Sequence, residues 1–203
     1  MRPLLPAILA MAAVVLASNI LVQIMLGDWL TWGALTYPVA FLVTDVTNRV
    51  HGVTAARKVV AAGLVVGIAC SLVAAGLDKT TLRIAAGSGL AFVVAQLWDV
   101  SIFDRLRDRG WWQAPFLSSL AGSAADTALF FAIAFAAFLP ADGNTGWANE
   151  TVPVLGLGPM APLWVSLALA DWMVKLGLAT LALVPYRGLV LKILSSRADN
   201  RLT

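Results

Sequence analysis

The chain has 203 residues, of which 60% are hydrophobic and only 12% are charged, and its mean hydropathy is +0.86. Soluble domains carry roughly 25% charged residues, so this composition excludes an ordinary soluble protein and indicates an integral membrane protein. The formal charge of +3 does not indicate nucleic acid as a direct partner, because the basic residues are scattered among the ends of apolar runs, as is typical of membrane topology.

Apolar runs close to the roughly 20 residues that a helix needs to cross hydrocarbon recur along the chain. The alternating segments of an outer-membrane barrel are missing from the sequence. We therefore predict an all-α polytopic membrane protein, a bundle of six transmembrane helices in a single membrane domain over 1–203. The bundle is expected over 7–184, followed by a basic cytoplasmic tail over 185–203.

The first predicted span covers 7–26. Its apolar run continues well beyond the roughly 7 to 15 residues of a signal-peptide core, so we expect a retained helix. Asn19 and Gln23 lie one turn apart in it and can face a partner helix. Residues 28–33 then form a short connection.

The second predicted span, 35–50, is short for a membrane crossing and contains ionisable and polar groups. On a period of 3.6 residues, one face carries Tyr37, Phe41, Asp45 and Asn48. Because an Asp at the bilayer centre costs about 2.5 to 3.5 kcal/mol on insertion scales, such residues usually face the interior of a bundle. This face therefore offers aromatic and hydrogen-bonding groups together.

A basic turn over 51–58 leads to the third predicted span, 59–77, and 78–83 leads to the fourth, 82–103. Five side chains share one face of the fourth span: Ser88, Phe92, Gln96, Asp99 and Phe103. Asp99 is expected close to the cytoplasmic interface, because charged residues follow it within two turns.

The fifth predicted span, 114–139, places Asp126 near mid-membrane, at 1.5 Å of rise per residue, where its own helix offers it no partner. Ser118 and Gly122 lie on the same stripe, and we expect these small residues to leave room beside the carboxylate. On the general rule for ionisable residues inside membranes, Asp126 is a functional candidate.

A loop over 140–159 without Lys or Arg precedes the sixth predicted span, 161–184. Asp171 and Lys175 lie one turn apart in this span. They either neutralise each other and hold helices together or take part in a binding site. The carboxylates, Lys175 and the polar amides of the other spans are too costly to scatter into lipid, so we expect them to converge.

The distribution of basic residues predicts the orientation. With the N-terminus inside, eleven of the 14 Lys and Arg residues fall in cytoplasmic segments, two (Lys79 and Arg83) fall in external loops, and Lys175 lies in a span. The positive-inside rule then places both termini in the cytoplasm. In a bacterial cell the membrane would be the inner membrane.

Enzymatic chemistry and cofactors are not indicated. Ser88 lies between two glycines, as in some intramembrane proteases, but the only histidine, His51, falls in a loop and not near it. One His and one Cys do not make a usual transition-metal site, and a phosphate-binding glycine loop is absent. We therefore expect no enzyme, no metal and no cofactor.

An ordered set of motifs resembles the queuosine precursor transporter family, also called the vitamin uptake transporter family, over about 19–185. The set comprises Tyr37-Pro38, Phe41-Leu42, Thr44-Asp45, Gly52, Gln96-Leu97-Trp98-Asp99, Phe103-Asp104, Ser118-Ser119, Asp126, Phe130-Phe131, Asp171 and Lys175. The chain departs at Arg49, which stands where the TDxxxE pattern of many relatives has Glu after Asn48. The resemblance implies an inner-membrane importer of the 7-deazaguanine bases preQ0 and preQ1, salvaged for queuosine in transfer RNA.

This function suits the candidate residues. A deazaguanine offers adjacent N–H donors to a carboxylate and a carbonyl to an amide or lysine, and its flat ring suits an aromatic face. The predicted substrate-binding residues are Asn19, Phe41, Asp45, Asn48, Phe92, Gln96, Asp126, Asp171 and Lys175. The expected partners are the base, membrane lipid and, as one option, further copies of the chain.

Two other classes remain open. A substrate-capture subunit that works with a separate energising ATPase would have a similar size and helix number, and it would not transport alone. A non-transporting structural membrane subunit would tolerate the neutral replacement of Asp126 without loss of activity of its complex.

Overall fold

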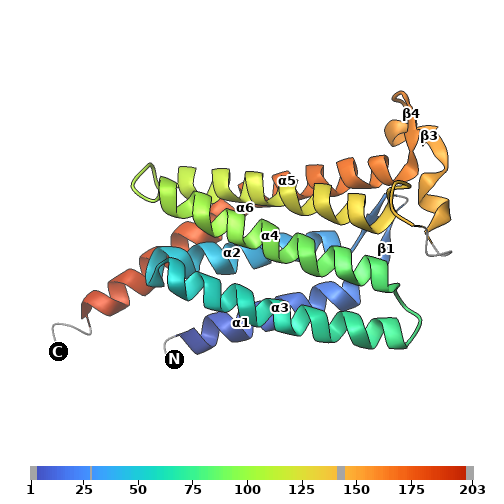
Figure 1. The fold of residues 1–203 in the computed structure, drawn as a ribbon. Helices are drawn as coiled ribbons and strands as arrows, with labels where there is room; N and C mark the ends of the chain where they lie inside the picture. The colour runs from blue at the N-terminus through green and yellow to red at the C-terminus, as the bar shows by residue number, and fades with distance from the viewer. Residues whose placement is uncertain (1–3, 28, 141–144, 200–203) are drawn as a thin grey trace.

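The computed structural model describes residues 4–27, 29–140 and 145–199, within which the chain forms six α-helices that pack into one bundle (Figure 1). The helices are α1 (Leu5–Leu21), α2 (Gly33–His51), α3 (Val53–Gly76), α4 (Leu82–Leu106), α5 (Gln113–Phe135) and α6 (Leu163–Asp199). Strands β1 (Met25–Leu26) and β2 (Leu30–Thr31) pair antiparallel, as do β3 (Thr151–Pro153) and β4 (Met160–Pro162), with 3-10 turns η2 (Gly146–Asn149) and η3 (Val154–Gly156) beside them.

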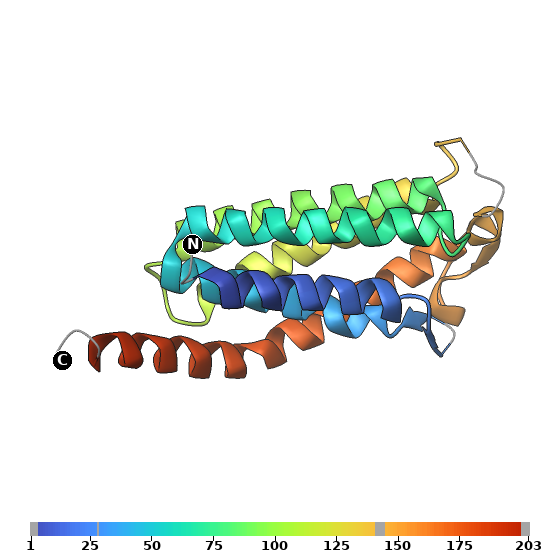
Figure 2. The same cartoon turned by 90° about the horizontal axis from the view of Figure 1, so that it is seen from below.

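The two ends of the bundle differ. α1 begins and α6 ends at one end, which we call the terminal end, and both strand pairs lie at the other, the hairpin end (Figures 1 and 2). Within the bundle, α4 packs along α5, α1 packs on α2 and α3, and α6 packs on α2 and α5. The position of each candidate residue along its helix therefore shows whether it lies nearer the terminal end or the hairpin end of the bundle.

The prediction of an all-α polytopic membrane protein is confirmed. In the described part of the chain, α3, α4, α5 and α6 are each long and apolar enough to cross a membrane. α1 is apolar but has only 17 residues, and α2 has 19 residues with several polar ones among them. Six crossings therefore remain a prediction.

Most helix boundaries fall near the predicted ones, with differences at connections. α1 ends at Leu21 and not at 26, because Met25 and Leu26 form β1, which is followed by the turn to β2 that begins at Gly27, whose φ is +70°. The predicted turn over 51–58 is almost absent: α2 passes into α3 through Gly52 alone, with φ +84° and ψ 173°. Few other residues adopt that backbone conformation, which explains a glycine at this joint.

The described part of the predicted tail over 185–203 is helical and continuous with the sixth predicted span. α6 continues without interruption through Pro185 to Asp199 and extends past the other helices at the terminal end (Figure 2). A proline ring has a helical φ and removes a single backbone donor, so the helix bends or adapts there without stopping. Tyr186 and Val190 pack with Phe103 in a buried cluster, which holds the first turns of the extension against the bundle.

Candidate functional site

A buried group of charged side chains joins α5 to α6. Lys175 Nζ lies 2.7 Å from Asp126 Oδ2 and 2.5 Å from Asp171 Oδ2, and it donates to Thr127 Oγ1 at 3.2 Å. Thr127 in turn donates to Asp171 Oδ2 at 2.8 Å. The side chains of Lys175, Asp126 and Asp171 are 6%, 5% and 14% exposed. We call these four residues the lysine cluster.

The pairing of Asp171 with Lys175, predicted from their spacing, is confirmed. The partner of Asp126 comes from another helix, which its own sequence neighbourhood did not reveal. One ammonium group between two carboxylates gives the lysine cluster an excess of one negative charge when all three groups are ionised. Such an excess in a buried place favours a bound cation or a ligand that donates several hydrogen bonds.

The three charged residues of the lysine cluster form the floor of a cavity of about 410 Å³. Along α6 the cavity is lined by Leu163, Leu167, Asp171 and Lys175, and along α5 by Phe135, Phe131, Phe130 and Asp126. In both helices the ionic residues are the ones farthest from the hairpin end. The lining continues to Trp29 and Thr80 in the connections, so the cavity reaches the hairpin end of the bundle.

The walls of this cavity combine aromatic and polar surface. The aromatic lining residues are Trp29, Phe130, Phe131, Phe135 and Trp147, and the polar ones above the floor include Ser18, Asn19, Gln23, Ser71 and Ser88. A volume of this size lies within the range of about 300 to 1,000 Å³ that small-molecule sites occupy. The geometry suits a flat, polar molecule.

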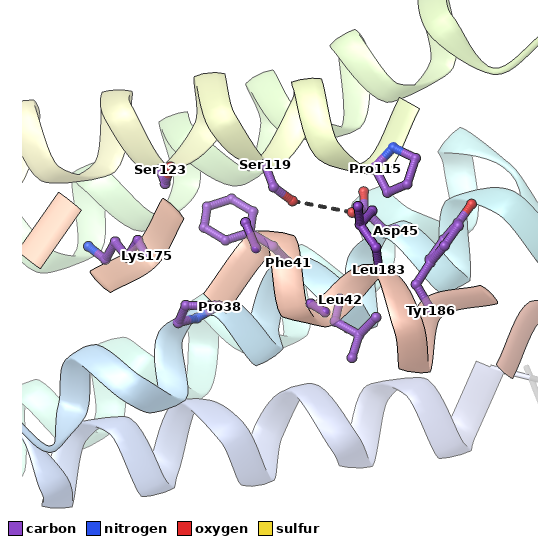
Figure 3. Close-up of a pocket in the computed structure, with 12 residues that line it drawn as sticks. Pro38, Phe41, Leu42, Asp45, Pro115, Ser119, Ser123, Lys175, Leu183 and Tyr186 are labelled. Carbon is purple, nitrogen blue, oxygen red and sulfur yellow. Dashed lines mark hydrogen bonds between the residues drawn. The ribbon is translucent and has the colours of Figure 1, made fainter. Parts of the chain in front are cut away.

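The structure brings four of the predicted site residues to this cavity: Asn19, Asp126, Asp171 and Lys175. Phe41 and Asp45 instead line a smaller pocket on the terminal side of Lys175, together with Ser119 and Tyr186 (Figure 3). Asp45 is 2% exposed and accepts hydrogen bonds from two serines of α5. Lys175 lines both the cavity and the smaller pocket.

Asn48 and Gln96 are fully buried in contacts between helices. Asn48 Nδ2 donates to the Val100 carbonyl at 3.0 Å, and its Oδ1 accepts from Arg107 at 2.8 Å. Gln96 Oε1 accepts from Thr44 at 2.7 Å. These hydrogen bonds connect α2 to α4. Both amide side chains therefore stabilise the packing of these two helices.

The predicted faces also carry Phe92, Asp99 and Tyr37. Phe92 lies in the apolar core formed by α1 to α4, although it also touches a second small pocket that Asn19 lines. Asp99, expected near an interface, is fully buried. The side chain of Tyr37 lies outside the residues whose side chains the structure describes.

The expected room beside Gly122 is already occupied. A Cβ atom at this position would lie 2.8 Å from Phe41 Cε1 and 3.2 Å from Asp99 Cβ. The small residue therefore admits neighbouring side chains from α2 and α4 and leaves no cavity there. The open space lies on the hairpin side of Asp126 instead.

Sequence reasoning missed Thr127 and the aromatic wall. Thr127 belongs to a polar stripe with Ser119 and Ser123, at steps of four residues along α5, and this spacing was the available signal. The adjacent Phe130 and Phe131 belong to the motif set named above, but their pattern did not mark them as lining a cavity, because aromatic pairs are common in membrane helices. Within the described residues, no group of three or more His, Cys, Asp or Glu side chains gathers as a metal site.

A helical membrane bundle with a cavity that ends on buried, unevenly balanced charges has the architecture of a solute transporter. Comparison with known proteins agrees: the sequence profile of the family described as "Putative vitamin uptake transporter" matches residues 31–190. The chain belongs to this family, which makes it a membrane transporter and not an enzyme.

Curated relatives are similar over most of the chain. A "Queuosine precursor transporter" of Escherichia coli (strain K12) is 32% identical over 207 residues, covering 93% of this chain and 86% of the relative. A "Probable queuosine precursor transporter" of Haemophilus influenzae is 36% identical over 189 residues, covering 85% and 73%. A protein of the same description from Bacillus subtilis (strain 168) is 31% identical over 135 residues, covering 55% and 59%. No solved structure matches the chain.

Proposed function

We propose that this protein imports queuosine precursors, the 7-deazaguanine bases preQ0 and preQ1, across the bacterial inner membrane. The observation that carries the proposal is the lysine cluster at the floor of the aromatic cavity. The names of the relatives indicate the class of solute, and the cavity offers the groups that such a solute needs.

The bases and the cavity are complementary in hydrogen bonding. The ring N–H and exocyclic NH₂ groups of a deazaguanine are adjacent donors, which match the two oxygens of a carboxylate such as Asp126 or Asp171. Its carbonyl accepts from an ammonium or amide donor, and Lys175 and Asn19 line the same space. The flat ring can stack on Phe130 or Phe131 in the wall.

The excess negative charge of the lysine cluster should make the two bases bind with different affinities. The aminomethyl group of preQ1 is cationic and would compensate the second carboxylate, whereas the nitrile of preQ0 is neutral and would need only a donor or an apolar slot. We therefore expect the site to hold preQ1 more tightly than preQ0. Both bases share the ring edge that the carboxylates recognise.

The positive-inside rule gives the cavity its direction. The two external basic residues, Lys79 and Arg83, lie at the hairpin end of the bundle, between α3 and the first turn of α4. If the terminal end is cytoplasmic, the cavity opens to the outside and its floor faces the cell interior. This arrangement is the one in which an importer receives its solute.

The decisive experiment is uptake of labelled preQ0 and preQ1 into cells that cannot make queuosine precursors, with this chain as the only importer. Queuosine should return to transfer RNA only when the chain is expressed. A matched control is Asp108→Asn, an exposed acid outside the cavity, which should behave as the wild type. Transport by the purified chain alone in liposomes would exclude a capture subunit that depends on a separate ATPase, and absence of uptake in cells would refute the proposal.

A further inference from the structure

Two buried carboxyl groups face each other between α2, α4 and α5, apart from the lysine cluster. Asp45 is 2% exposed and Asp99 is 0% exposed. They lie close enough for the charge of each carboxyl group to act on the other. We call these two residues the acid pair.

The hydrogen-bond donors around the acid pair bond to Asp45 and not to Asp99. Ser118 Oγ lies 3.4 Å from Asp45 Oδ1, and Ser119 Oγ donates to Asp45 Oδ2 at 3.3 Å. Ser118 is also near Asp99, but a hydroxyl has a single proton to donate. Among the residues that the structure describes, neither oxygen of Asp99 has a hydrogen-bond donor in good geometry.

The basic groups on the surrounding helices are engaged elsewhere. Lys175 of α6 bonds to the carboxylates of the lysine cluster, Asp126 of α5 among them. Arg49 of α2 donates to the Arg107 carbonyl, and Arg107 donates to Asn48 and pairs with Asp104 at the surface.

The other helices bring no cation to the acid pair. Tyr186 of α6 is a neutral neighbour that lines the same pocket as Asp45. On α3 the two basic residues, Arg57 and Lys58, are exposed. The described part of α1 has no ionisable side chain. Among the described residues the acid pair therefore has no Lys or Arg partner of its own.

Elementary electrostatics then requires a proton. Two carboxylates in contact cannot both stay ionised in a low-dielectric interior, since like charges repel and each loses its hydration. A single proton removes one charge and also supplies the missing donor, as in other carboxyl dyads that share a proton. A metal ion is a poorer fit, because no group of three acidic or metal-binding side chains gathers among the described residues.

We propose that the acid pair is the coupling site of a proton-driven importer, which binds one proton from the outside and releases it to the cytoplasm in each cycle. An O–H bond to one carboxyl oxygen forms on loading and breaks on release, when the proton passes to water, and no other bond changes. The inference rests on the proposed function, because a coupling site has meaning only in a transporter.

The position of the acid pair connects it with the solute site. Phe41 of α2 lies between Lys175 and Asp45 in the small pocket (Figure 3). The close approach at Gly122 brings the same ring beside Asp99, since a Cβ atom there would touch both. A change in how α2 packs on α5 after proton loss would therefore act on Phe41 and on the environment of Lys175 together.

The test uses the purified chain in liposomes with labelled preQ0, which is uncharged and does not itself respond to a membrane potential. With the potential clamped, an outside-acid gradient of one pH unit should sustain up to about tenfold accumulation at one proton per solute. Asp99→Asn should abolish this accumulation and still exchange preQ0 at equal pH on both sides. Asp108→Asn, an exposed acid, should accumulate like the wild type.

Several results would overturn the coupling site. They are wild-type accumulation that ignores the pH gradient, accumulation driven by a sodium gradient alone, and an Asp99→Asn protein that still concentrates preQ0. If Asp99→Asn does not fold, Asp45→Asn and the wild-type response to pH and sodium decide the same question. A wild-type protein that cannot exchange preQ0 at equal pH would instead remove the proposed function.

Discussion

Lys175 of α6 reaches across to Asp126 of α5, with 2.7 Å between Nζ and Oδ2. The same ammonium group also pairs with Asp171 one turn earlier on its own helix. The balance of buried charge therefore depends on two helices and not on α6 alone. This relationship changes what neutralising substitutions should do.

The first prediction concerns Lys175→Leu, which leaves Asp126 and Asp171 buried without their cation. We expect a loss of about 3 to 5 kcal/mol in the free energy of unfolding, as for other broken buried pairs. Lys175→Leu/Asp171→Leu should recover only part of it, because the Asp126 carboxylate still lacks the ammonium group. The additional Asp126→Asn change should recover more, as measured by thermal unfolding in detergent. Equal stability of the single and double variants would contradict the pairing, and Lys192→Leu, which is exposed, is the control.

The second prediction concerns Asp126→Asn in transport. The amide is nearly isosteric and can still accept from Lys175, so the protein should reach the membrane at normal levels. It loses the charge that holds paired N–H donors, so the base should bind at least about tenfold more weakly, or 1.4 kcal/mol. Calorimetry with preQ0 and preQ1 would measure this, with Asp104→Asn as an exposed control. Unchanged binding by a well-expressed variant would mean that Asp126 is structural.

A third prediction compares two glycines. Gly122→Ala would place Cβ 2.8 Å from Phe41 Cε1 and 3.3 Å from the Ala95 carbonyl oxygen, whereas a Cβ atom at Gly89 would meet no atom within 4 Å. Overpacking should cost Gly122→Ala about 1 to 3 kcal/mol of stability. Gly89→Ala should be neutral or slightly stabilising, since Ala has the better helix propensity. Similar melting temperatures for the two variants would show that the contact at Gly122 relaxes easily.

A fourth prediction concerns Arg83, which was expected only as an external charge. Its guanidinium donates to the carbonyls of Ile133 at 2.7 Å and Ala136 at 2.6 Å, at the C-terminal end of α5. Replacing it with Met should lower stability by about 2 kcal/mol, because these carbonyls lose charged donors. Lys should rescue poorly, since it lacks the planar fork. Arg105→Gln is an exposed control, and an unchanged melting temperature for Arg83→Met would refute the capping role.

The fifth prediction concerns topology. Reporters fused after Thr203 and inserted within 142–149 should report opposite sides of the membrane, with the C-terminus in the cytoplasm. The structure places the end of α6 and the β3–β4 pair at opposite ends of the bundle, as this requires (Figure 1). If both reporters lie on one side, the orientation and the direction of the cavity must be revised.

The helices could be predicted from the sequence because hydropathy over about 20 residues reflects the same physics that embeds a helix in lipid. The ion pair of Asp171 and Lys175 followed from helical spacing. The partner of Asp126 did not, since it depends on how α5 and α6 pack. The burial of Asp99 did not follow from its position along the helix either: closeness to charged residues in sequence predicts nearness to the membrane surface, but burial within the bundle depends on which face meets a neighbouring helix.

The length of α6 depends on tertiary contacts as well. Hydropathy detects where a chain leaves lipid and not where its helix stops. Contacts of Tyr186 with Phe103, on a helix far away in sequence, keep the extension ordered. Sequence reasoning therefore located the polar groups better than the surfaces that surround them.

Among the described residues, Lys175 is the one side chain that lines both the open cavity and the small pocket towards the opposite end of the protein. At this level the Lys175 side chain and the residues beside it are all that separates the cavity from the small pocket. A path between the two compartments at this level therefore begins with a change in the position of the Lys175 side chain. A shorter residue at this position is a candidate for a leaky carrier that conducts water and small ions.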